Sequence, residues 1–390
     1  MLFRSALQND GHVWAKLGER TPKFDQLQTY LSRWCPEPNF SSLHGSLLQE
    51  SSAIEVWIHA NAVELLMNDE VAFGVRCKTQ TGMETTFTAE LYVFCLGAIE
   101  SSRFFLQPRD GALPWNSSGL VGRHFQDHID CDAATVIPHS NAALHRIFDA
   151  IYLKGYKYNP KLKMTQETQK KESILSSGAT FFSVSDLDET LVAMKMTAKR
   201  LLRGNFSGIS THEAWQLVRN GPLLIRQAHR LAMHHRVYHP ALAEIKMRVH
   251  CEQEPTSNSS ITLSNDRDEF GQYRTKLNWK ISDLELRTIR RFTKIVQSSL
   301  TSLAKIIPDP LLVEGAANFR DRCEDSFHHM GGMRMNDSPQ CGVVDRHLRL
   351  HGTRNVYICS SAVFPTSGFS NPTHSLLALT VRLADRLARA

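Results

Sequence analysis

Residues 91–106 read LYVFCLGAIESSRFFL, and they join the pattern of a strand to the pattern of a helix. Leu91 to Leu96 form a continuous apolar run, which is typical of a strand that is buried on both faces. After Gly97, residues 98–106 show helical spacing. A strand, a glycine and a helix in this order predict an α/β unit, and the helix N-terminus is a common phosphate site. The signal is weak alone, because any α/β turn has this pattern.

A second type of pattern lies further along the chain. Ile245, Met247 and Val249 alternate with polar residues, which predicts a half-buried strand. Residues 261–263 and 273–279 continue an antiparallel set. Residues 282–285, Ser-Asp-Leu-Glu, form a capping box that opens a long amphipathic helix. The sequence therefore predicts a mixed α/β (α+β) fold with an antiparallel sheet backed by helices.

Composition excludes several classes of protein. The chain has 390 residues and a net charge of +6, and its basic clusters lack interleaved aromatic residues, so a solvated surface is favoured over nucleic-acid binding. The eight cysteines are scattered without a C-x-x-C pair, which favours free thiols in a reducing compartment. No apolar run has the length of a membrane span, and the N-terminus lacks the apolar core of a signal peptide. We expect a cytoplasmic protein.

Two polar residues near the C-terminus are candidates for catalysis. His328 is followed by Gly331 and Gly332, so a ligand could approach an imidazole that can accept a hydroxyl proton. A buried structural histidine is the alternative interpretation. Asn371 is a plausible N-cap with Pro372 in the first helical position, but its amide could also hold an alcohol oxygen.

Other catalytic classes find little support. His124 and His128 have the i, i+4 spacing of a metal pair, but Phe125 stands where an H-E-x-x-H motif needs glutamate, and we predict no metal site. There is no G-x-S-x-G segment of a serine hydrolase. There is also no G-x-G-x-x-G turn and no P-loop.

Several segments, in the same order along the chain, resemble the glucose-methanol-choline (GMC) oxidoreductases, which are FAD enzymes that oxidise alcohols. The resemblance runs from about residue 33 to the end. The matching segments are Ile58–Leu65, Leu96–Arg103, Leu120–His128, Glu252–Pro255 with Ile261–Leu263 and Arg267–Gly271, His328–Met335, and Asn371–Thr373. Each segment is weak evidence alone, but together and in order they are specific.

The resemblance implies a role for each matching residue. His328 would accept the substrate hydroxyl proton while a hydride leaves for flavin N5, and Asn371 would position that hydroxyl. The substrate would be a small alcohol or sugar, most similar to those of the sugar- and polyol-oxidising branch. The residues implied to bind FAD are Ala62, Gly97, Ala98, Ser360, Ser361, Asn371, Pro372 and Thr373.

The resemblance also implies a domain organisation. Residues 1–122 and 336–390 would form a partial FAD-binding domain, and residues 123–335 a substrate-binding domain. The glycine-rich segment of the family is not found, so the FAD/NAD(P)-binding domain is expected to be incomplete. Ser360 also stands where the family often has aspartate, and His374 where an apolar residue is usual. The alternative hypothesis is a truncated, non-catalytic remnant, or a subunit that needs a separate chain to bind FAD.

Overall fold

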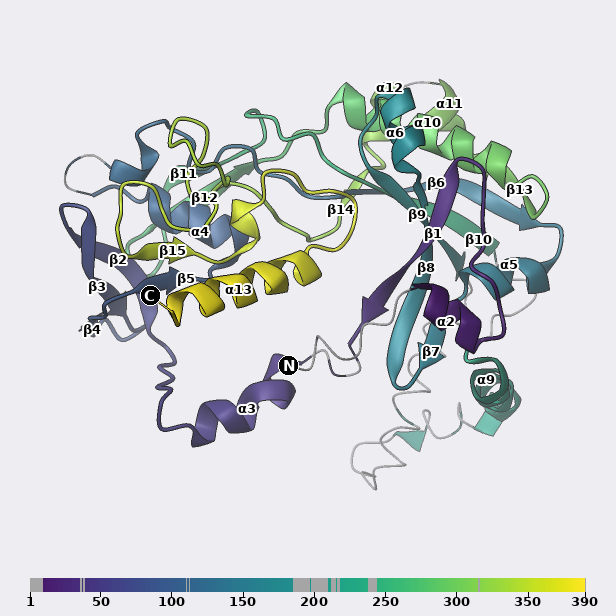
Figure 1. Cartoon of the computed structure of the whole chain (residues 1–390), viewed down its shortest axis with the longest axis horizontal. Helices are drawn as coiled ribbons and strands as arrows, with labels where there is room; N and C mark the ends of the chain where they lie inside the picture. The colour runs from purple at the N-terminus through teal and green to yellow at the C-terminus, as the bar shows by residue number, and fades with distance from the viewer. Residues whose placement is uncertain are drawn as a thin grey trace.

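The computed structural model describes residues 10–184 apart from 36, 38, 110 and 112, residues 197, 210, 211 and 215, residues 218–237, and residues 244–389 apart from 315. Its elements form two lobes that lie side by side in Figure 1. One lobe is built on a large antiparallel sheet, and the other on three small sheets and two helices. The predicted mixed α/β fold, with an antiparallel sheet backed by helices, is confirmed.

The large sheet has the strand order β1-β8-β9-β10-β6-β13, with β7 added beside β8 and β14 beside β6. Every pairing in it is antiparallel. Its strands are β1 Leu27–Trp34, β6 Ile129–Pro138, β7 Ile151–Leu153, β8 Tyr156–Met164, β9 Ser177–Val184, β10 Glu244–Cys251, β13 Ala304–Pro308 and β14 Glu324–Asp325. In β10 the predicted alternation is confirmed, because Ile245, Met247 and Val249 are buried while the residues between them are partly exposed.

Helix α10, Asp283–Ser299, covers this sheet and supplies much of its core. The predicted capping box is present: the Ser282 side chain accepts from the Leu284 backbone, and the Glu285 carboxylate accepts from the Ser282 N–H. Phe292 is fully buried at the centre of the helix. The remaining helices of this lobe are α2 Asp10–Lys16, α5 Asn141–Phe148, α6 Gln166–Glu172, α9 Gly221–His234, α11 Pro310–Glu314 and α12 Ala316–Arg320.

The second lobe has a hydrophobic core of its own. Its sheets are β2-β3-β4, the parallel pair β5 and β15, and the hairpin β11-β12, which packs on α4. The elements are β2 Asn61–Asn68, β3 Val71–Lys78, β4 Glu84–Phe87, β5 Tyr92–Phe94, β11 Ser260–Arg267, β12 Tyr273–Asn278, β15 Val356–Ile358, α4 Gly97–Leu106, α13 Thr373–Leu387 and the short 3-10 turns η1 Pro114–Asn116 and η2 Ser361–Val363. Helix α3, Phe40–Glu50, has no buried residue and lies apart from both lobes in Figure 1.

The strand of the opening segment differs from its prediction. β5 follows the predicted order of strand, glycine and helix, but Val93 at its centre is 43% exposed. The prediction of burial on both faces is therefore wrong. Among the described residues, β5 pairs only with β15, so its apolar side chains are covered on one face.

The start of α13 also differs from its prediction. The helix begins at Thr373, Pro372 occupies the N-cap position, and no side chain caps the helix. The N-cap prediction for Asn371 is wrong, and its side chain is available for another contact. None of the described helices combines the length and apolar character needed to cross a membrane.

The predicted domain limits stay a prediction. Two contacts show how the chain crosses between the lobes. β1, from the segment before residue 122, pairs along its length with β8 of the large sheet. The β11-β12 hairpin, from the segment between 123 and 335, packs instead on α4.

Candidate functional site

Two backbone pairings bring the His328 loop against the segment that enters β6. Met330 and Gln126 exchange both of their backbone hydrogen bonds at 2.8 Å, and Asp325 of β14 pairs with Ile129 of β6. Between these pairings lie two residues on one segment, 127 and 128, and four on the other, 326–329. The longer segment must bulge, and Phe327 takes a positive φ of 56° within it. This bulge presents the His328 ring.

The two glycines after His328 allow this close approach. Gly331 has φ +75°, and a Cβ there would lie 2.1 Å from the backbone oxygen of His124. Gly332 has φ +91°, and a Cβ there would lie 2.2 Å from Ser102 Oγ. Both distances are shorter than non-bonded atoms can adopt, and both φ values favour glycine. The glycines are therefore required by the packing of the loop on its neighbours.

His328 lies between Asn371 and His128. Its Nε2 is 2.9 Å from Asn371 Nδ2, and its Nδ1 is 3.2 Å from His128 Nδ1. The structure thus brings together the two residues that the sequence predicted as catalytic. His128 was considered only as half of a metal pair, and its contact with His328 was missed. The Asp-His sequence at 127–128 was the available signal, since it belongs to one of the matching segments.

The hydrogen bonds select one tautomer of each histidine. An amide nitrogen only donates, so Nε2 of His328 is an acceptor when it faces Asn371 Nδ2. A neutral His328 then carries its proton on Nδ1 and donates it to His128 Nδ1. Burial, followed by the charge on His328, lowers the pKa of His128 to about 4, so His128 is the neutral acceptor. Burial also lowers the pKa of His328, while the Asp130 carboxylate acts in the opposite direction.

Asp127 holds the backbone under both rings. Its Oδ1 accepts the N–H of His128 at 2.6 Å and the N–H of His328 at 3.0 Å. Its own N–H donates to Gln253 Oε1, which also accepts from Trp279 Nε1, each at 2.8 Å. Burial raises the pKa of Asp127, and the two backbone N–H groups oppose that change.

A second group of predicted residues gathers at the start of α4. Gly97 has φ +77°, and a Cβ there would meet no atom within 4 Å. No side chain caps this helix. Ser360, just after β15, donates to the Gly97 carbonyl at 3.3 Å and lies 3.3 Å from Ser101 Oγ. Open space at an uncapped helix N-terminus, beside the ends of two parallel strands, fits an anionic cofactor such as FAD.

The other predicted cofactor residues are more dispersed. Ser361 links the two groups, because its Oγ donates to the His329 carbonyl at 2.7 Å and its carbonyl accepts the N–H of Gly331 at 3.1 Å. Ala98 is buried in the first turn of α4. Ala62 lies in β2, in the neighbouring three-stranded sheet. Pro372 and Thr373 follow Asn371 at the start of α13.

His124 and His128, which have the spacing of a metal pair, each contact other groups in the structure. His124 Nδ1 lies 2.9 Å from the Pro255 carbonyl, and His128 faces His328. The one group of histidine, cysteine and acidic residues that could hold a metal ion within the described chain contains neither of them.

Comparison with known proteins finds a family match in the C-terminal part of the chain. The family model described as "GMC oxidoreductase" matches residues 255–380, which include both His328 and Asn371. A "6'''-hydroxyparomomycin C oxidase" of Streptomyces lividus is 23% identical over 402 aligned positions, covering 99% of this chain. The C-terminal part of the chain, residues 255–380, therefore matches the GMC oxidoreductase family. The whole chain spans 58% of the length of the Streptomyces lividus relative.

Three further proteins are similar to this chain. The "Fructose dehydrogenase large subunit" of Gluconobacter japonicus is 27% identical over 134 residues, which are 34% of this chain and 23% of that protein. The crystal structure of pyridoxine 4-oxidase from "Mesorbium loti" gives a TM-score of 0.53 at 12% identity, covering 88% of this chain and 60% of that one. A formate oxidase of Aspergillus oryzae RIB40 gives 0.53 at 17% identity, covering 96% and 68%. These structures support the fold alone.

Proposed function

We propose that this chain takes part in the FAD-dependent oxidation of a CH–OH group. In this proposal His328 is the base that accepts the hydroxyl proton. Asn371 holds the hydroxyl oxygen beside it. The substrate is an alcohol, a sugar or a polyol.

The contact between His328 and Asn371 carries the proposal. The Nε2 atom of His328 has no proton in the tautomer that its contacts require, and an amide N–H lies 2.9 Å away. A hydroxyl entering between them would accept a hydrogen bond from Asn371 and donate its proton to His328. His128 supports this state from the other side of the ring, because it accepts the Nδ1 proton.

The substrate class is inferred from the relatives. One is named for a hydroxylated paromomycin and another for fructose. Both names refer to compounds with many hydroxyl groups. A polyhydroxylated sugar-type substrate is therefore the first class to test.

FAD is the proposed cofactor. Gly97, Ala98 and Ser360 would hold it at the start of α4, and Ser361 would connect that region to the His328 loop. Bound FAD would supply the acceptor for the hydride that leaves the substrate carbon. The residues of this chain would orient the alcohol and accept its proton.

A partner chain is part of the proposal. The fructose dehydrogenase relative is named as a large subunit. We propose that a separate chain can complete the FAD site. Adding FAD to the purified chain tests this point, because weak binding alone and strong binding after the partner is added would support it.

The catalytic proposal is tested by exchanging His328 for alanine. We expect the His328→Ala variant to bind flavin as the parent does, measured by its visible absorbance, and to lose about 10²- to 10⁴-fold in turnover with a sugar alcohol and a dye acceptor. The exposed His347 provides the matched control, and His347→Ala should be unchanged.

Two results would contradict parts of this proposal. Normal turnover in the His328→Ala variant would remove His328 as the base. Protein that stays colourless with FAD, both alone and with any copurifying chain, would support the alternative of a non-catalytic remnant.

A further inference from the structure

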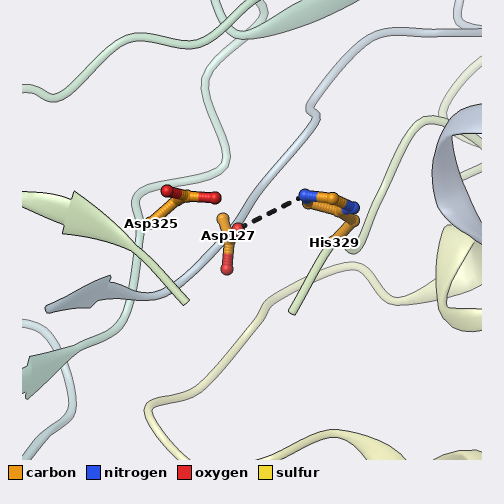
Figure 2. Close-up of side chains that lie close together, drawn as sticks. All are labelled: Asp127, Asp325 and His329. Atoms are coloured by element: carbon orange, nitrogen blue, oxygen red, sulfur yellow. Dashed lines mark ion pairs between the residues drawn. The ribbon is translucent and has the colours of Figure 1, made fainter. Parts of the chain in front are cut away.

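Two carboxylates and one imidazole lie close together beside the loop that carries His328. Asp127 lies just before β6, Asp325 belongs to β14, and His329 follows in the bulged segment (Figure 2). The same two backbone pairings that form the bulge bring them together. One potential metal-ligand atom from each side chain lies within 4.8 Å of the others.

Asp127 contributes an oxygen whose hydrogen-bonding capacity is unused. Its side chain is only 2% exposed, and its Oδ1 is occupied by two backbone N–H groups. Its Oδ2 is buried and has no hydrogen-bond partner in the structure. Its ion-pair partner, His329 Nε2, lies 3.7 Å away, which is too far for a hydrogen bond. A buried carboxylate oxygen without a partner is unfavourable, and it is a suitable ligand for a bound cation.

The charges at this point also favour a cation. Within the part of the chain that the structure describes, neither Asp127 nor Asp325 forms an ion pair with lysine or arginine. The carboxylates of Asp127 and Asp325 therefore lie together beside the imidazole of His329. A cation with two positive charges would neutralise both carboxylates and could also bind the imidazole nitrogen as a ligand.

We propose that Asp127, Asp325 and His329 bind a divalent transition-metal ion such as Zn²⁺. Two carboxylate oxygens and one imidazole nitrogen are suitable ligands for this class, and they leave a coordination position for water. Asp325 is exposed and His329 is 34% exposed, so an ion can enter from solvent.

The geometry requires only a small adjustment. Ligand atoms at about 2.1 Å from a tetrahedral ion lie about 3.4 Å apart. The separation of 3.7 Å between Asp127 Oδ2 and His329 Nε2 is already close to that value. The exposed Asp325 side chain can rotate to close the remaining distance.

The site would have a structural consequence for the proposed active site. The ion would bind one oxygen of Asp127, and the other oxygen holds the backbone N–H groups of His128 and His328. The metal would therefore fix the loop that presents His328, without touching the substrate. This makes Asp127 a positioning residue.

The test is a titration of the untagged chain with Zn²⁺ by calorimetry, without FAD, so that the result does not depend on oxidation activity. We expect saturable binding of one ion and a rise in the unfolding temperature. Asp325→Asn should weaken binding by about 10-fold or more, since it removes a ligand on the exposed side and leaves the buried Asp127 in place.

Asp321→Asn is the matched control, because Asp321 is also an exposed aspartate, four residues away. It should bind Zn²⁺ as the parent does. His329→Gln provides a second ligand variant and should also lose affinity. The absence of saturable binding by the parent, or equal affinity in Asp325→Asn and Asp321→Asn, would overturn the proposal.

Discussion

At the scale of single residues, the conformation of the His328 loop depends on close contacts with residues from other segments. The imidazole is oriented by Asn371 on one side and His128 on the other. Its backbone is held by Asp127, and the loop closes only because Gly331 has no side chain. The position of the proposed base is thus determined by contacts from two other segments, residues 124–128 and the segment of Asn371.

The close approach at Gly331 can be measured. We predict that Gly331→Ala lowers the free energy of unfolding by about 2 kcal/mol or more, because the new Cβ meets a backbone oxygen and the φ is unfavourable for alanine. Urea unfolding gives this value. Gly119→Ala is the control, since Gly119 has φ +67° with nothing within 4 Å, and it should lose about 1 kcal/mol. Equal losses in both variants would show that φ alone matters.

At the scale of elements, α4 connects the proposed cofactor site to the β11-β12 hairpin. Arg103 of α4 forms an ion pair with Asp268 at the hairpin turn and donates to the Tyr273 carbonyl at 2.9 Å. Asp268 Oδ1 also accepts the N–H groups of Phe270 and Gln272 at 2.9 Å. Burial would raise the pKa of Asp268, but the Gln272 N–H, Arg103 and the Phe270 N–H together lower it.

This ion pair predicts a pH dependence. A lowered pKa in the folded state stabilises the protein above the unfolded value of about 3.9, and this contribution disappears as the pH falls through the folded pKa. At pH 7 we expect Asp268→Asn to lose about 1 kcal/mol of stability, and the difference from the parent to shrink at about pH 3. Urea unfolding at both pH values tests this.

Asp266, two residues earlier and exposed, provides the control. Asp266→Asn should match the parent at both pH values. A loss in Asp268→Asn that is the same at pH 7 and pH 3 would show that the charge of this carboxylate is unimportant.

At the scale of the whole molecule, the two lobes have separate cores, and α3 belongs to neither. Its apolar side chains Phe40, Leu47 and Leu48 are each more than 40% exposed. A helix of 11 residues without tertiary packing is only marginally stable in water. In α10, by contrast, side chains such as Phe292 anchor the helix in the core of the large sheet.

Hydrogen exchange should separate these two helices. We expect the amides of α3 to exchange within seconds in the isolated chain, and those of α10 to exchange at least about 10³-fold more slowly. Mass spectrometry of peptides from residues 40–50 and 283–299 measures both. Slow exchange in α3 would instead mean that another surface covers its apolar side chains.

Local patterns were sufficient where the physical cause is local. The capping box of α10 and the alternation in β10 were predicted because each depends on residues a few positions apart. The exposure of Val93 was not, because burial of a strand depends on what packs against it from elsewhere in the chain. The N-cap prediction for Asn371 failed for a related reason, since its amide faces a histidine 43 positions away.

The sequence by itself determined the class of fold, the family resemblance and the pair His328 and Asn371 as candidates. Only the tertiary structure decided that this pair meets, that His128 supports the ring, and that Asp127, Asp325 and His329 share one point. The reason is physical. Ring tautomers, a buried carboxylate oxygen and a shared charge all depend on distances of a few ångströms between segments about 200 residues apart, and no local pattern specifies such distances.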